Sequence, residues 1–133
     1  MINDLVSDFL TRIRNALMMK HKSVKVCNSK VIVDLSNVLL KEGYIIAFNK
    51  IKNKKGKYFY LNLDLKYDEN GKSMITGLKR VSKLGLRIYC SVKNLPLIRN
   101  GIGIAIVSTS RGVMSCKQAK KKKVGGELVC SVW

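Results

Sequence analysis

Acidic residues are scarce in this chain. Only 8 Asp and Glu stand against 26 Lys and Arg in 133 residues, a formal net charge of +18. A chain this basic repels itself unless an anionic partner neutralises it, and nucleic acid is the commonest such partner. A membrane surface is the alternative, which would require a cationic amphipathic segment or a long apolar span.

The scarcity of acids is greatest in the second half of the chain. Residues 70–126 hold no Asp or Glu but 13 Lys and Arg, whereas the first 69 residues hold the other 13 basic residues and seven of the eight acids. Scattered solvated lysines are the ordinary explanation of a basic surface. An acid-free stretch of this length instead favours a surface that binds a polyanion.

Residues that build metal sites and covalent cross-links are few. The only histidine is His21, and the cysteines form no C-x-x-C pair, so the sequence predicts no metal site and no cofactor. No secretory signal is present, which argues against a disulfide framework. We therefore expect reduced, partly buried thiols at Cys27, Cys90, Cys116 and Cys130.

Catalytic and membrane-spanning motifs are also missing. The sequence has neither a G-x-S-x-G nucleophile elbow nor a G-x-x-x-x-G-K-[ST] phosphate loop, and Gly101-Ile102-Gly103 lacks the rest of a dinucleotide fingerprint. No run of 18 apolar residues occurs, so no transmembrane helix is expected. No Arg-rich leader precedes the first predicted helix, which fits a bacterial cytosolic protein or one made inside an organelle. We predict that the chain is not an enzyme.

The first 69 residues carry the pattern of a small α/β domain. A helix capped by Asn3 or Asp4 is predicted from apolar residues at helical spacing, namely Val6, Phe9, Leu10, Ile13 and Leu17. A strand at 24–26 precedes a second helix, which Ser29 caps and which runs to about Glu42, with Val31, Leu35, Val38 and Leu39 facing inward. Strands at 44–52 and 57–65 then form a hairpin through a turn at 53–56.

The turn signal Asn70-Gly71 predicts a boundary between an N-terminal α/β domain, 1–69, and a C-terminal, β-rich domain, 70–133, whose scarcity of acids favours binding of a polyanion such as RNA. Strands are expected at 74–81, 86–91, 104–107 and 128–133, with a turn at 100–103. A short helix begins at Ser115, continues to Lys123 and is ended by Gly125-Gly126. The fold class is therefore α+β: a helix-strand-helix-strand-strand unit followed by a mostly β domain with a short helix.

A run of hydroxyls follows the strand predicted at 104–107. Ser108, Thr109 and Ser110, with Arg111 beside them, can hydrogen-bond phosphates, ribose hydroxyls and base edges at once, although such a run is often only a turn or helix cap. Glu127 either pairs internally with a basic residue or accepts hydrogen bonds from a base. Its position after Gly125-Gly126, where backbone can approach a ligand, favours hydrogen bonding to a nucleic-acid base.

Two further groups could bind nucleic acid. Arg87 and Tyr89 share a face of a predicted strand, so the one can hold phosphate while the other stacks on a base, unless Tyr89 is simply half-buried. A lysine cluster follows, of which Lys120 and Lys121 are the candidates for phosphate contact and the rest supply general attraction.

Four segments together resemble the bacterial-type small-subunit ribosomal protein eight family. They are D-F-L-T-R-I-R-N-A at 8–16, R-V-S-K-L-G-L-R-I-Y at 80–89, G-I-G-I-A-I-V-S-T-S-R-G-V-M at 101–114 and V-G-G-E at 124–127. They follow the family's order and span nearly the whole chain.

The resemblance implies two α/β domains and a protein that binds an irregular helix in the central domain of small-subunit ribosomal RNA early in assembly. It implies that the residues meeting the irregular core are Ser108, Thr109, Ser110, Tyr89 and Glu127, and that the backbone contacts come from Thr11, Arg14, Asn15, Ser29 and Lys30. It implies small-subunit proteins five and two as neighbours, and a place on ribosomes of a bacterium or an organelle, the plastid stroma in particular.

The chain departs from the family at two points. Leu84 stands where the family usually has proline, which is expected to loosen the turn before Gly85. The short helix begins Ser115-Cys116-Lys117-Gln118 without the usual acid, which removes a helix-dipole stabilisation of ~0.3–1 kcal/mol.

Overall fold

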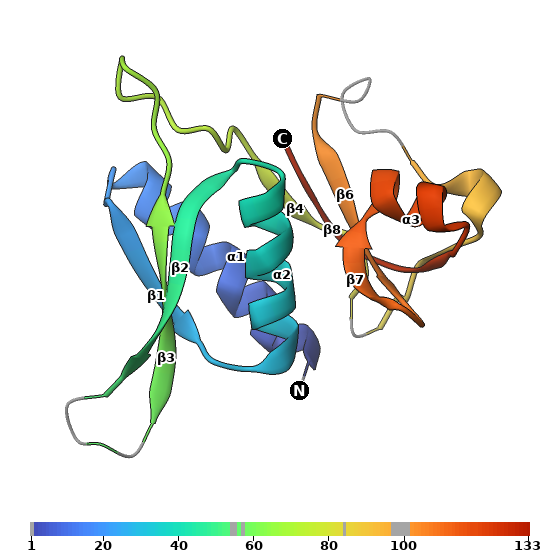
Figure 1. The fold of residues 1–133 in the computed structure, drawn as a ribbon, viewed down its shortest axis with the longest axis horizontal. Coiled ribbons are helices and arrows are strands. Elements are labelled where there is room, and N and C mark those ends of the chain that lie inside the picture. The colour runs from blue at the N-terminus through green and yellow to red at the C-terminus, as the bar shows by residue number, and fades with distance from the viewer. Residues whose placement is uncertain (1, 54–55, 57, 84, 97–101) are drawn as a thin grey trace. The chain divides into compact units, whose positions relative to one another are not determined.

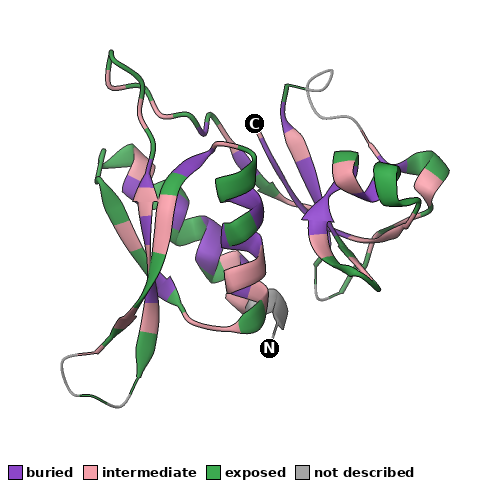
Figure 2. Ribbon diagram, in the orientation of Figure 1, coloured by how far each residue is buried: buried purple, intermediate pink, exposed green. Residues whose placement is uncertain are grey.

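The computed structural model describes residues 2–53, 56, 58–83, 85–96 and 102–133. They form two compact units, Met1–Ile75 and Thr76–Trp133 (Figure 1), and helices and strands of each carry buried residues (Figure 2). With three α-helices and two antiparallel sheets among the described residues, the predicted α+β fold class is confirmed. The boundary predicted between domains 1–69 and 70–133 stays a prediction.

The first unit has the predicted element order. It consists of α1 (Ile2–Met18), β1 (Ser23–Cys27), α2 (Lys30–Lys41), β2 (Ile45–Lys52) and β3 (Phe59–Leu65). The strands form an antiparallel sheet in the order β1-β3-β2, and both helices lie on one side of it (Figure 1). The alternating Leu61, Leu63 and Leu65 of β3 are buried, as their spacing predicts.

The helix boundaries of the first unit largely follow local chemistry. Ser29 caps α2 as predicted, since its Oγ accepts a hydrogen bond from the Ile32 N–H at 3.4 Å, and Gly43 at φ +80° follows the helix end. The cap predicted for α1 is wrong, because the helix already begins at Ile2. Ile32, rather than Val31, is fully buried on α2.

The second unit is built around one central strand. It contains β4 (Leu78–Arg80), β5 (Tyr89–Cys90), the 3-10 helix η1 (Val92–Asn94), β6 (Ile104–Thr109), β7 (Gly112–Ser115), α3 (Cys116–Lys122) and β8 (Gly126–Val132). The sheet order is β4-β8-β6-β7, and β5 also pairs with β8. Strand β8 thus pairs with three other strands, all antiparallel.

Several strand predictions in this unit need correction. The strand predicted at 86–91 shrinks to β5, because the Ser82 Oγ hydrogen-bonds both the N–H and the carbonyl of Ile88 just before it. The strand predicted at 74–81 is confined to β4, and β7 was not predicted. Strand β6 extends to Thr109, two residues beyond its predicted end. Leu84, Lys54, Lys55, Asn100 and Gly101, which carry parts of the predicted turns, lie outside the described residues.

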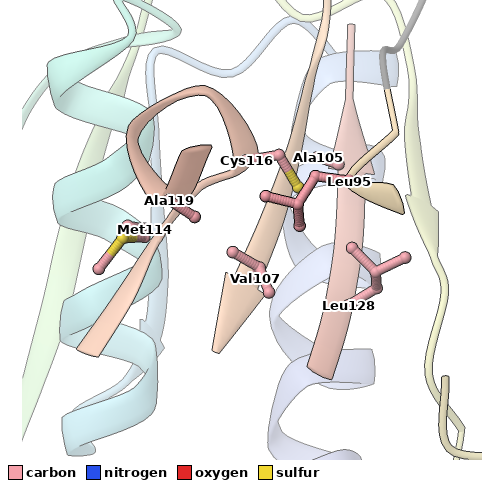
Figure 3. Close-up of a cluster of buried hydrophobic side chains, with 7 residues drawn as sticks. All are labelled: Leu95, Ala105, Val107, Met114, Cys116, Ala119 and Leu128. Carbon is pink, nitrogen blue, oxygen red and sulfur yellow. The ribbon is translucent and has the colours of Figure 1, made fainter. Parts of the chain in front are cut away.

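The short helix forms as predicted at its start but ends differently. Ser115 caps α3 by accepting a hydrogen bond from the Gln118 N–H at 3.2 Å. Lys123, in the left-handed conformation at φ +57°, ends the helix before the two glycines are reached. Beneath α3 lies a core cluster consisting of Leu95, Ala105, Val107, Met114, Cys116, Ala119 and Leu128 (Figure 3).

Gly125 and Gly126 are required by the chain's own backbone. A Cβ at Gly126 would fall far inside van der Waals contact with the Ser108 carbonyl oxygen, and one at Gly125 would do the same with the Cys90 carbonyl. Strand β8 therefore passes between β5 and β6 at a separation that no larger residue permits.

The cysteines are free thiols with very different exposure. Cys27 is exposed, whereas Cys116 and Cys130 are buried. Burial raises the pKa of the Cys116 thiol to about 11 and that of Cys130 to about 12. Because the thiolate is the reactive form, both groups are protected chemically as well as sterically.

We expect a thiol reagent at neutral pH to modify Cys27 first and to leave Cys116 and Cys130 unmodified until the second unit unfolds. Timed alkylation followed by peptide mass spectrometry measures this order, with a sample in denaturant as the control. Alkylation of Cys130 in the folded protein as fast as that of Cys27 would contradict the described packing.

We expect Gly126→Ala to lower the free energy of unfolding of the second unit by about 1–3 kcal/mol, because the added methyl must push β6 away. Gly85→Ala is the matched control, since a Cβ there meets nothing within 4 Å, and it should change stability by less than about 0.5 kcal/mol. Urea unfolding of both variants makes the comparison. Equal midpoints would show that the strands can separate without cost.

Candidate nucleic-acid interface

Three neighbouring strands bring together side chains that the sequence separates widely. Glu127 of β8 lies directly opposite Tyr89 of β5 on one side and opposite Ser108 of β6 on the other. Residues directly opposite one another in antiparallel strands project from the same face of the sheet. We call this set the Tyr89–Glu127–Ser108 row.

The row lies on the face of the sheet that α3 does not cover. Val107 and Leu128, which are adjacent to Ser108 and Glu127 in sequence and also face each other across β6 and β8, belong to the core cluster under α3 (Figure 3). Since successive residues of a strand alternate between faces, the row must point the other way. Tyr89 is 69% exposed there, which rules out the half-buried packing role considered from the sequence.

Glu127 forms an ion pair within the chain. Its Oε2 accepts a hydrogen bond from Arg87 Nη1 at 2.9 Å. Arg87 reaches it from the residues that precede β5, not from the strand that the sequence predicted. An ion pair this exposed contributes only about 0–1 kcal/mol of stability, so its main effect is to hold the carboxylate in place. The carboxylate keeps acceptor positions for a further hydrogen bond, so the internal pair and base recognition are compatible.

The three adjacent hydroxyls at the end of β6 do not share one role. Thr109 stabilises the β6–β7 hairpin, since its Oγ1 donates to the Gly112 carbonyl at 2.8 Å and accepts from the Arg111 N–H at 3.1 Å. Ser110 and Arg111 form the exposed two-residue turn, and Gly112 follows at φ +113°. Ser108 is exposed in the row. Thr109 therefore has the turn-stabilising role that the sequence left open for these hydroxyls, while Ser108, Ser110 and Arg111 present their side chains to solvent.

The remaining predicted contacts lie elsewhere. Thr11, Arg14 and Asn15 are exposed together on α1, three and four residues apart. Ser29 uses its hydroxyl as the α2 cap, and the Lys30 Nζ lies 3.7 Å from Asp34 Oδ2. Lys120 and Lys121 are exposed on α3.

A groove in the first unit was not foreseen. It has a volume of about 640 Å³ and is lined by Asp8, Arg12, Lys25, Val26, Cys27, Asn53 and Tyr60. The Asp8–Arg12 ion pair at 2.8 Å and the Lys25 ammonium, 4.9 Å from the centre of the Tyr60 ring, lie beside it. Its residues come from α1, from β1, from the residue after β2 and from β3, so no single motif reveals it.

Two structural findings bear on other classes of function. Within the part of the chain that the structure describes, no cluster of His, Cys, Asp and Glu could hold a metal ion. In the same part, every helix is too short or too polar to cross a membrane.

Comparison with known proteins identifies the family. The family model described as ribosomal protein S8 matches residues 4–133. Small ribosomal subunit protein uS8 of Campylobacter jejuni (strain RM1221) is 48% identical, with 100% of both chains covered. Protein uS8c of Gracilaria tenuistipitata var. liui is 47% identical, also over 100% of both chains, and uS8 of Clostridioides difficile (strain 630) is 43% identical over 99% of this chain and 98% of its own.

These relatives are ribosomal proteins and not enzymes, so the prediction that this chain is not an enzyme is confirmed. The matches span both units and include all four segments on which the resemblance was based. The chain belongs to the ribosomal protein S8 family.

Proposed function

We propose that this chain is a structural, RNA-binding component of the small ribosomal subunit that recognises an irregular helix in the central domain of the ribosomal RNA and supports assembly. The observation that carries the proposal is the Tyr89–Glu127–Ser108 row, a directional polar and aromatic surface on an otherwise basic unit. The relatives, which are small ribosomal subunit proteins, support the assignment to that subunit. Small-subunit proteins five and two are the proposed protein neighbours.

Each member of the row supplies a different interaction. The exposed Tyr89 ring offers a flat apolar face on which an unpaired base can stack. Glu127 is the only acid between residue 70 and the chain end, and it can accept hydrogen bonds from base amino or imino groups, which lysine and arginine cannot do. Ser108 can both donate and accept. Together these three groups can distinguish an irregular RNA core from a regular duplex.

Phosphate contacts hold the RNA against this row. Arg111 projects from the hairpin turn at the end of β6 and is proposed to hold phosphate, as is Arg87, which also anchors Glu127. The exposed hydroxyl of Ser110, in the same turn, is proposed to add a directional contact to the irregular core beside the row. Gly125 and Gly126 act indirectly, since they let β8 pass close enough to β5 and β6 to bring the row together. The phosphate contacts position the RNA, and the contacts of the row determine which RNA is bound.

The first unit supplies sequence-independent contacts. Thr11, Arg14 and Asn15 on α1 and Lys30 at the start of α2 are proposed to meet the RNA backbone. Ser29 is proposed to act through its backbone and through the α2 cap that it forms.

A membrane-binding or general DNA-condensing protein would also be basic. Neither role needs a paired acid and an exposed aromatic ring in register on one sheet face. Binding to anionic vesicles in competition with RNA separates these functions.

We expect Glu127→Gln and Ser110→Ala each to weaken binding of the cognate RNA helix by ~1–3 kcal/mol, the size of one lost directional contact. Binding of a scrambled duplex should barely change. Ser23→Ala, which alters an exposed serine of β1, is the matched control and should bind both RNAs normally. Equal losses on cognate and scrambled RNA would show that these groups do not read shape.

We expect Tyr89→Leu to weaken binding of the cognate helix by ~1–3 kcal/mol, whereas Tyr89→Phe should keep most of the affinity because the stacking surface remains. Both titrations use the same cognate helix. If the Phe variant loses as much as the Leu variant, Tyr89 acts through its hydroxyl and the stacking role is wrong.

A further inference from the structure

The sheet of the second unit separates two surfaces with different chemistry. One face carries the Tyr89–Glu127–Ser108 row. The other face is covered by α3, which packs Cys116 and Ala119 onto Val107 and the rest of the core cluster (Figure 3). The two surfaces are therefore separated by a sheet and a helix, and the distance between packed layers is about 10 Å.

The outer side of α3 is a dense cationic surface. Lys117, Lys120 and Lys121 are all exposed and are three and four residues apart, which places them side by side on a helix. Lys122, the last residue of the helix, and Lys123, its C-cap, extend the charge to the helix end. We call Lys117, Lys120 and Lys121 the α3 lysine ridge.

The ridge has no acidic neighbour in its own unit. The only acid in Thr76–Trp133 is Glu127, which is paired with Arg87 on the opposite face of the sheet. Among the described residues, the ion pairs of Arg12 with Asp8 and of Lys30 with Asp34 lie in the first unit. The charge of the ridge is thus left for an external anion.

Helix stability alone does not explain this charge. Lysines in the last turn of a helix interact favourably with its dipole, but Lys117 lies in the first turn, where the dipole disfavours a cation. Like charges at positions i and i+4, as at Lys117 and Lys121, also repel each other. The α3 lysine ridge therefore lowers the stability of its own helix, and cations retained at such a cost indicate a polyanionic ligand.

From these observations we propose that the α3 lysine ridge binds the phosphate backbone of a second RNA segment, distinct from the helix that the row recognises. The second unit would then join two RNA elements, one on each face of its sheet. This inference rests on the proposed function for the identity of the first RNA. The ridge carries no aromatic or acidic side chain, so its binding depends on backbone charge and on salt, not on sequence.

Amine acylation with mass spectrometric readout tests the arrangement on the whole chain. With the cognate helix bound at saturation, acylation of the ridge lysines should proceed within about twofold of its rate in the free protein. Adding an unrelated A-form RNA duplex at about ten times its dissociation constant should then slow their acylation about tenfold. If the cognate helix alone protects the ridge, the two surfaces hold one RNA and the inference is wrong.

A charge-matched pair of variants tests the site. In K117Q/K120Q/K121Q, the slope of log affinity against log salt for the second duplex should fall by about 3, while the affinity for the cognate helix changes less than about threefold. The control variant removes the same charge from exposed lysines outside the ridge, as K41Q/K66Q/K79Q, and should keep most of that slope.

The outcomes separate this inference from the function on which it rests. If the two triple variants lower the salt slope for the second duplex equally, the ridge contributes only general electrostatic attraction. That result would overturn this inference and leave the proposed function intact. Binding of an acidic peptide in place of the duplex would overturn it too. A failure of the wild-type protein to prefer the cognate helix over a scrambled duplex would instead overturn the proposed function, whatever happens at α3.

Discussion

The pairing of β8 with β5 on one side and β6 on the other is the constraint on which the second unit depends. Strand β8 pairs with three strands, and it can approach β5 and β6 only because Gly125 and Gly126 lack side chains. The next residue, Glu127, is therefore held between Tyr89 and Ser108. The same pairing aligns Val107 with Leu128 on the other face, where they form the floor of the α3 core. One backbone arrangement thus sets both the core and the proposed recognition surface.

Electrostatics explain why a single acid is proposed to be central to recognition. In a chain with a formal net charge of +18, affinity for RNA is supplied by many interchangeable cations. Discrimination needs groups that a lysine cannot imitate, and a carboxylate that accepts hydrogen bonds is one of them. The ion pair with Arg87 holds the Glu127 carboxylate in one orientation, at little cost because both groups remain partly exposed to water.

Local patterns predicted most of the first unit, because its signals are short in range. The spacing of Phe9 and Ile13, the Ser29 cap and the alternation of Leu61 and Leu63 each depend on a few neighbouring residues. In the second unit the informative contacts are long in range. Ser82 shortens a strand by bonding Ile88, and Arg87 meets Glu127 across 40 residues of sequence. The resemblance to a family named the candidate residues, but only the strand register shows that Tyr89, Glu127 and Ser108 form one row while Thr109 stabilises a turn.

The measurement that tests the central claim most directly is a titration of the wild-type protein with the cognate central-domain helix and with a scrambled duplex of equal length, at two salt concentrations. Phosphate contacts weaken with salt on both RNAs, whereas directional contacts to an irregular core do not depend on counterion release. If the row recognises the irregular core, the cognate helix will bind more tightly by several kcal/mol and keep most of that margin at high salt. Equal affinities that fall together as salt rises would contradict it, leaving a basic protein without the shape recognition assigned to the Tyr89–Glu127–Ser108 row.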